Sequence, residues 1–209
     1  TSCISDGILY DFNDLPVINL DKPWWNQSAR KNLEIGGTLL AMSGDLIYSP
    51  YDAVYFNKVI MDEHQISYPY EKVIEGTWTW DYLAEITKNV TQDVDGDNEY
   101  TEKDRYGFVI DENLSSMTRL IHSNGLTIAT KDENGYPTLD NLMSDKLQTI
   151  VDNYYSFVWE DNRCYFAGVT GKNGCVEMFA NGQAMMMHTQ THKMPLLRDV
   201  AFDFGIVPL

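Results

Sequence analysis

Hydrophobic and polar residues recur along this chain with two different periods, which alternate. Short apolar runs bounded by glycine, proline or asparagine are typical of β-strands. The run from Ile35 to Tyr48 is interrupted by Gly44, so it predicts a strand, a turn and a second strand. Three further runs predict single strands: YGFVI (106–110), QAMMMHT (183–189) and FDFGIVPL (202–209).

The segments between these strands carry apolar residues at helical spacing. Residues 49–64 predict a helix capped by Ser49, with one apolar face made of Ala53, Phe56, Asn57, Ile60 and Met61. Residues 76–93 predict a second helix, which Thr79 caps. Further helices are predicted at 115–126, 142–161 and 176–182, and a hairpin around Asn134 and Gly135.

Strands that alternate with helices predict an α/β domain with a mixed sheet flanked by helices, whose ligand crevice lies at the carboxyl ends of its strands. Residues 1–35 differ, because the stretch LPVINLDKPWWNQ has no clear period. We interpret them as a connector or the remnant of a first lobe. Residues 36–209 are then expected to form the main α/β lobe.

Charge and composition narrow the classes of partner. The 209 residues carry a formal net charge of −16, which repels phosphate backbones and anionic lipid headgroups. Nucleic acid is therefore excluded as an expected partner. No apolar run approaches the roughly 20 residues that span a bilayer, and the N-terminus has no signal-peptide pattern. The chain begins at Thr1, so we expect a piece of a longer protein.

Three cysteines leave two arrangements open. Cys164 and Cys175 flank a short loop, so they could form a disulfide in an oxidising compartment or remain separate thiols, while Cys3 has no obvious partner. The chain has no C-x-x-C pair, so the sequence does not support a thiolate zinc site or a redox motif.

The loop DVDGDNEYTEKD (93–104) resembles a twelve-residue calcium loop. Asn98 replaces the usual glycine, and an aspartate closes the loop where glutamate is usual. We expect a structural calcium ion here; the alternative is a solvated acidic turn closed by its own hydrogen bonds. The expected ligands are the carboxylates of Asp93, Asp95, Asp97 and Asp104 and the backbone carbonyl of Glu99.

No catalytic residues are predicted. His188 and His192 are four residues apart, but Thr189 stands where a zinc protease needs a glutamate, so a satisfied surface or cleft pair is expected instead. The 31 acidic residues allow carboxylate pairs, yet none has the apolar or strand-end setting of a glycosidase acid.

Five stretches in order resemble the extracellular solute-binding proteins (family 1) of bacterial ABC transporters, related to maltose-binding protein. They are DFNDLPVINLDKPWWNQ, GDLIYSPYDAVYFNK, GTWTWDYLAEITKNVTQDVDGDNEYTEKDRYGF, MFANGQAMMMH and FDFGIVPL. The resemblance implies a type II periplasmic-binding-protein fold, of which this chain would be a truncated part containing mostly the second lobe. It also implies a monomeric lipoprotein, anchored outside the cell, that delivers a sugar or oligosaccharide to a permease.

The resemblance also places cleft-lining loops in this chain, from which we expect ligand contacts at Asp45, Tyr48, Ser115, Gln190 and His192. The loop HTQTHK (188–193) lacks the stacking aromatic that sugar binders often carry there. Of the tryptophans, Trp80 and Trp159 are expected in the core, whereas Trp24 and Trp25 lie in the irregular stretch. The alternatives to a solute-binding function are a calcium-stabilised adhesion module and a glycoside hydrolase.

Overall fold

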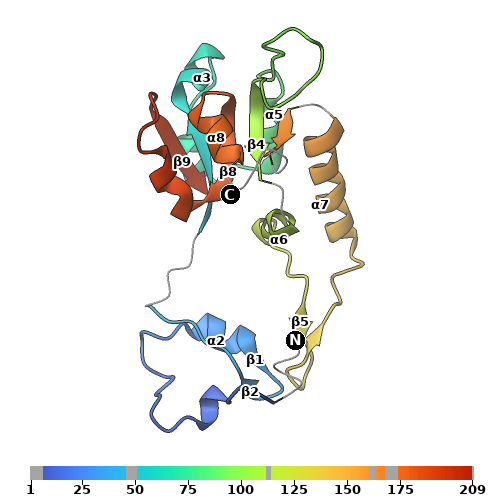
Figure 1. Cartoon of the computed structure of the whole chain (residues 1–209). Helices are drawn as coiled ribbons and strands as arrows, with labels where there is room; N and C mark the ends of the chain where they lie inside the picture. The colour runs from blue at the N-terminus through green and yellow to red at the C-terminus, as the bar shows by residue number, and fades with distance from the viewer. Residues whose placement is uncertain (1–6, 46–50, 112–113, 161–162, 168–173, 209) are drawn as a thin grey trace. The chain divides into compact units, whose positions relative to one another are not determined.

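The computed structural model describes residues 7–45, 51–111, 114–160, 163–167 and 174–208 (Figure 1). The chain divides into two compact units, and each is discontinuous in sequence. The first contains residues 1–49 and 127–144, and the second contains 50–126 and 145–209. The chain therefore passes from one unit to the other at three places. The expected boundary at residue 35 lies inside the first unit.

The first unit is built from short elements. A 3₁₀ turn (Phe12–Asp14) and helix α2 (Gln27–Leu33) precede a hairpin of β1 (Glu34–Ile35) and β2 (Thr38–Leu39). The strand, turn and strand expected over 35–48 are thus reduced to this hairpin within the described residues. The second hairpin pairs β5 (Thr130–Lys131) with β6 (Pro137–Thr138), around Gly135 as predicted.

The two hairpins of the first unit are joined by polar contacts. Gly36 donates its N–H to the carbonyl of Gly135 at 3.3 Å, and the Lys131 ammonium donates to the carbonyls of Lys31 and Glu34. Leu20 and Leu39 are the buried hydrophobic residues among those described in this unit. Backbone and polar contacts, more than a large core, therefore hold this unit together.

The second unit contains a five-stranded mixed sheet in the order β7-β4-β8-β3-β9. Strand β4 runs parallel to β7 and β8, whereas β3 runs antiparallel to β8 and β9. The expected mixed α/β architecture is confirmed. The strands are β3 (Asp52–Asn57), β4 (Tyr106–Ile110), β7 (Cys164–Phe166), β8 (Ala184–Gln190) and β9 (Phe204–Pro208).

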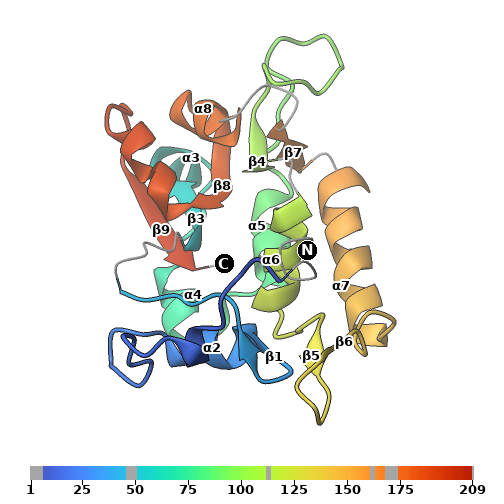
Figure 2. The same cartoon turned by 60° about the horizontal axis from the view of Figure 1, so that its bottom comes forward.

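Helices cover both faces of this sheet (Figures 1 and 2). One core cluster joins the sheet to α3, α5 and the π-helical turn, and the other joins it to α8 and the 3₁₀ segment after β8. The helices are α3 (Lys58–Glu63), α4 (Tyr70–Ile74), α5 (Trp80–Thr87), α6 (Leu114–Ser123), α7 (Asp145–Tyr155), the π-helix Ser156–Glu160, α8 (Gly174–Ala180) and the 3₁₀ segment Thr191–Leu197. No helix in the described ranges is long and apolar enough to cross a bilayer.

The helix predicted over residues 49–64 is wrong in its first half. Residues Asp52–Asn57 form β3, and the helix begins only at Lys58, capped by the Asn57 side chain through the N–H groups of Val59 and Ile60. Strand β3 lies inside the sheet, so both of its faces are buried and no alternation marks it. The expected cap, Ser49, lies outside the described residues.

The other predicted caps are confirmed. Thr79 Oγ1 accepts the N–H of Tyr82 at the start of α5. Helices α6 and α8 each end on a glycine with positive φ, Gly125 at 68° and Gly182 at 73°. In both, two backbone bonds close the last turn in the Schellman pattern.

The two tryptophans expected in the core differ. Trp80 packs against Phe108 and Phe157. Trp159 lies on the π-helix with 55% of its surface exposed, and its ring is tilted against that of Phe166, with ring centroids 5.2 Å apart. The core assignment of Trp159 is therefore wrong, since Phe157 and Val158 are the buried residues of this π-helix.

Candidate functional site

The candidate site lies at one edge of the second unit's sheet, where several polar side chains gather. Strands β4 and β8 run parallel and end there, and antiparallel β3 begins there. The register places Ile110 beside His188, and Asp52 opposite Gln190. This is the edge at which open α/β sheets bind ligands.

Asp52 joins two basic side chains at this edge. Its Oδ2 lies 2.9 Å from Nε of Arg119 on α6, and its Oδ1 lies 3.4 Å from Nε2 of His188 on β8. The side chain of His188 is 3% exposed, whereas those of Asp52 and Arg119 are 20% and 25% exposed. A buried imidazole therefore lies behind a carboxylate, which contacts a guanidinium that reaches the surface.

Asp111, directly after β4, joins two further elements. Its Oδ2 accepts from the Lys193 ammonium at 2.7 Å, and its Oδ1 accepts the Cys175 N–H at the start of α8. The Asp111 and Lys193 side chains are each 17% exposed. A carboxylate near a helix N-terminus is stabilised by the helix dipole. Asp111 thus fixes Lys193 beside the end of β4.

Tyr51 adds an exposed aromatic ring to the same edge. Its carbonyl accepts the Thr191 N–H at 2.8 Å, and its N–H donates to Thr191 Oγ1 at 3.2 Å. These two bonds hold the backbone of Tyr51, while the residue as a whole is 74% exposed, so its ring faces solvent. The ring offers an apolar surface at this end of the sheet.

The expected ligand-binding residues are only partly described. Gln190 ends β8 at the candidate edge, and His192 is exposed in the 3₁₀ segment that follows. Asp45 is exposed in the first unit, where its N–H bonds to the Trp24 carbonyl. Tyr48 lies outside the described residues. Ser115 lies in α6, but its side chain is not among those described.

Sequence reasoning missed the charged residues of this edge. Asp111 carries a signal, since it directly follows a buried strand, and Lys193 closes the same loop as His192. Asp52 carries no such sequence signal, because the residues around it were predicted to form a helix. Arg119 carries none either, since its partner is 67 positions earlier in the chain, a pairing that only the fold creates.

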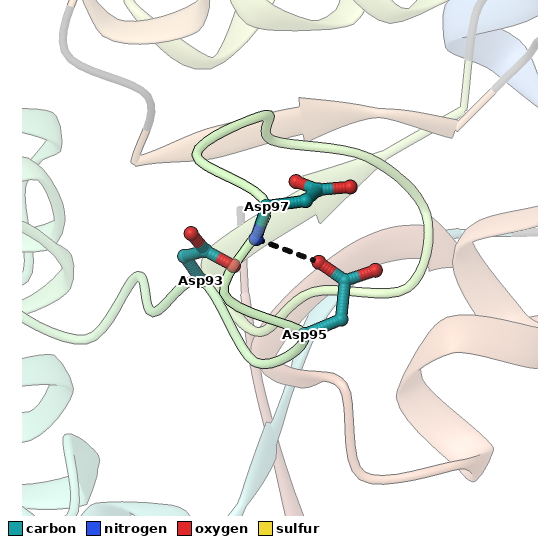
Figure 3. Close-up of side chains that lie close together, drawn as sticks. All are labelled: Asp93, Asp95 and Asp97. Carbon is teal, nitrogen blue, oxygen red and sulfur yellow. Dashed lines mark hydrogen bonds between the residues drawn. The ribbon is translucent and has the colours of Figure 1, made fainter.

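The acidic loop brings three of its five expected calcium ligands together (Figure 3). One carboxylate oxygen from each of Asp93, Asp95 and Asp97 lies within 4.8 Å of the others. Asp93 also accepts the N–H groups of Gly96 and Asn98. Asn98 has the left-handed backbone that position six of such a loop requires, with φ of 64°.

Asp104 has another role in this structure. It is fully buried, and its two oxygens accept the N–H groups of Val94 and Thr101, each at 2.8 Å. These bonds hold the pKa of Asp104 below its usual value, because they stabilise the carboxylate despite burial. Asp104 therefore closes the loop by hydrogen bonding and lies outside the three-aspartate group. Glu99 is exposed, and its carboxylate is not part of that group either.

The cysteine alternatives are resolved for two residues. Of the two arrangements left open, the structure has separate thiols, since Cys164 and Cys175 are both buried and not joined by a disulfide. Burial raises the pKa of both thiols. Cys3 lies outside the described residues.

No family model matches the chain, and no curated protein matches it. The assignment of the fold therefore depends on comparison with solved structures.

Solved structures of ABC solute-binding proteins match nearly the whole chain. UgpB from Mycobacterium tuberculosis in complex with glycerophosphocholine has a TM-score of 0.64 at 17% identity, over 100% of this chain and 47% of its own. The maltose-maltodextrin binding protein of Alicyclobacillus acidocaldarius has a TM-score of 0.64 at 14% identity, over 100% and 48%. An ABC transporter solute-binding protein from Agrobacterium vitis S4 with bound D-mannitol has a TM-score of 0.60 at 19% identity, over 99% and 47%.

These matches confirm the fold expected from the sequence resemblance. The chain has the type II periplasmic-binding-protein fold of ABC solute-binding proteins, and it spans about half the length of the solved structures. At such low identity the likeness establishes the fold, and function must be argued from the site.

Proposed function

We propose that this chain is part of the substrate-binding component of an ABC importer and binds a neutral, hydroxyl-rich solute, such as a sugar or polyol, without altering it. The observation that carries the proposal is the polar edge of the second unit, where Asp52 pairs with Arg119 and Asp111 pairs with Lys193. The fold supports it, because one matched structure is named as a maltose-maltodextrin binding protein and another as an ABC transporter solute-binding protein with bound D-mannitol.

The charge balance of this edge favours a neutral solute. Each of the two cations is already paired with a carboxylate, so an anionic solute would have to compete with Asp52 or Asp111. A hydroxyl group can donate to a carboxylate and accept from a guanidinium or ammonium at the same time. The exposed ring of Tyr51 adds an apolar surface, which suits the C–H face of a sugar.

The same proposal covers the parts of the system that lie beyond this chain. It places the chain in a two-lobed, monomeric protein on the outer face of the cell membrane, held there as a lipoprotein and delivering its solute to permease subunits. Support comes from the first unit, whose small core suits part of a larger lobe, and from the matched length. Asp45, Tyr48, Ser115, Gln190 and His192 remain the residues that we expect to contact the solute.

The test is a thermal-shift screen of the full-length protein against maltose, D-mannitol, other neutral sugars and a set of peptides. A solute that binds only the folded state raises the melting temperature. We expect stabilisation by one or a few neutral sugars or polyols and recovery of the solute unchanged. Stabilisation by peptides alone, or hydrolysis of a glycoside, would contradict the proposal.

We also propose that the acidic loop binds calcium as a structural ion, with Asp93, Asp95 and Asp97 as its side-chain ligands. The donors are oxygen atoms, which calcium prefers, and they lie close enough to share an ion. Glu99 would contribute its backbone carbonyl, and Asp104 would hold the loop closed. Calcium should raise the melting temperature of the chain, and Asp95→Asn should abolish this shift while the matched surface variant Asp152→Asn keeps it. An equal shift in both would refute the site.

A further inference from the structure

One arrangement at the sheet edge goes beyond general ligand binding. His188 and Asp52 lie on the same face of the sheet, because His188 pairs with Val54 and Asp52 is two residues before Val54. Such diagonal neighbours on adjacent strands lie close enough for their side chains to interact. Helix α6 contributes Arg119 to this face, so three elements supply the three side chains.

The buried end of this arrangement is polar where the sheet is otherwise apolar. His188 is flanked in the sheet by Val54 and Ile110, both members of the hydrophobic core. Its Nε2 and the Oδ1 of Asp52 are both buried, and neither has a hydrogen-bond partner among the described residues, although they face one another at 3.4 Å. A buried polar group without a hydrogen-bond partner is destabilising, so the pair needs a reason beyond packing.

We propose that Asp52 and His188 are positioning residues, which hold the guanidinium of Arg119 so that it binds the solute. The proposal rests on the proposed function and identifies Arg119 as the solute-contacting group. The Asp52 carboxylate bridges the two, with one oxygen on each partner, so His188 limits the rotation of the carboxylate and thereby that of the guanidinium. In metal sites, residues that hydrogen-bond to the metal ligands hold those ligands in position in the same way.

Arg119 connects the buried pair to the surface. A solute bound to its exposed part would fix the guanidinium and the carboxylate behind it. Arg119, at 25% exposure, is accessible enough for such a contact.

The first experiment needs no solute and measures the exchange of the Arg119 Nε–H with water by side-chain NMR of the 209-residue chain. The signal is assigned by its loss in Arg119→Lys. We expect slow exchange in the unaltered chain and at least roughly tenfold faster exchange in Asp52→Asn and His188→Met, since each removes a partner of the bridge. His188→Gln, whose amide nitrogen can replace Nε2, should restore slow exchange. An unchanged rate in a folded His188→Met chain would overturn the positioning role.

The second experiment measures the dissociation constants of maltose and D-mannitol by calorimetry on the full-length protein. We expect Arg119→Gln to weaken binding by roughly tenfold or more and His188→Met to weaken it by roughly tenfold, with His188→Gln close to the unaltered protein. In the double variant, His188→Met should add nothing to Arg119→Gln, since it acts through Arg119.

The outcomes separate the two proposals. If the losses of affinity of the two single variants multiply in the double variant, His188 affects binding through general stability. That result would overturn the positioning role but not the proposed function. Failure of the unaltered protein to bind maltose, D-mannitol or any neutral sugar would contradict the proposed function, while the exchange measurement would still decide whether His188 and Asp52 hold Arg119.

Discussion

Asp104 shows how a single buried carboxylate can organise a long loop. The loop from Asp93 to Asp104 leaves and rejoins the fold through a bridge between Gln92 and Arg105. Asp104 lies next to this bridge, and its carboxylate accepts the N–H groups of Val94 and Thr101 within the loop. Because both oxygens accept charge-assisted bonds, the ionised form is strongly favoured in the folded state.

We predict that Asp104→Asn lowers the free energy of unfolding by about 2 kcal/mol at pH 7, because an amide can accept only with its one oxygen. Folding lowers the pKa of Asp104, so its contribution is complete above the ordinary aspartate pKa of about 4 and is lost as the pH falls through the folded-state pKa. The difference between the variant and the unaltered chain should therefore shrink from pH 7 to pH 3 in urea unfolding curves.

The exposed Asp199 provides the matched control for this measurement. Asp199→Asn removes the same charge from the surface, where it makes none of these bonds, so its effect at pH 7 should stay within about 0.5 kcal/mol. If both variants lost the same stability with the same pH dependence, net charge would explain the result and the buried bonds would not.

Among the elements, β3 shows where sequence patterns stop being informative. Its residues Ala53 and Phe56, followed by Ile60 and Met61, fit a helical face although the first two are in a strand and the last two in a helix. Strands at the sheet interior lack alternation, so period alone cannot separate them from helices. Helix α5, by contrast, was predictable, because Gly76 and the capping residue Thr79 before it are local signals.

Gly107 lies where helix α5 approaches the sheet closely. A Cβ at this position of β4 would lie 2.3 Å from the backbone oxygen of Thr87 at the end of α5. We predict that Gly107→Ala lowers the free energy of unfolding by about 2–3 kcal/mol, since backbone must move to relieve the overlap. Urea unfolding followed by circular dichroism measures this loss.

Gly182→Ala separates overlap from backbone strain. Gly182 has φ of 73° after α8, but a Cβ there would meet no atom within 4 Å. We expect a cost of about 1 kcal/mol from the left-handed backbone alone. A loss in Gly107→Ala no larger than that in Gly182→Ala would show that α5 moves away easily.

For the whole molecule, the fold was more predictable than the site. Turn signals and apolar runs are local features of the sequence, and their order indicated a mixed α/β sheet. The five ordered stretches gave the resemblance to solute-binding proteins, which the solved structures confirm at the level of the fold. The pairs Asp52 with Arg119 and Asp111 with Lys193 join residues distant in sequence, so no spacing rule could reveal them. The first unit was also unexpected, since residues 127–144 return to it.

The free cysteines give a prediction for the whole fold. Cys164 and Cys175 lie buried on different sides of the mixed sheet, and burial raises the pKa of both thiols. Both should react with a thiol-alkylating reagent at least roughly tenfold more slowly in the native than in the unfolded chain, as measured by peptide mass spectrometry. A Cys164–Cys175 disulfide in the non-reduced protein would contradict this.

The three passages of the chain between its two units have a consequence for proteolysis. A protease that cuts the backbone once, at any one of these passages, cannot liberate either unit intact. Each unit consists of two segments, and after one cut at least one segment of each unit is still covalently joined to the other unit. Separation of two intact units requires a cut at all three passages. A nicked molecule should therefore migrate as one particle in a native gel and fall apart only in denaturant.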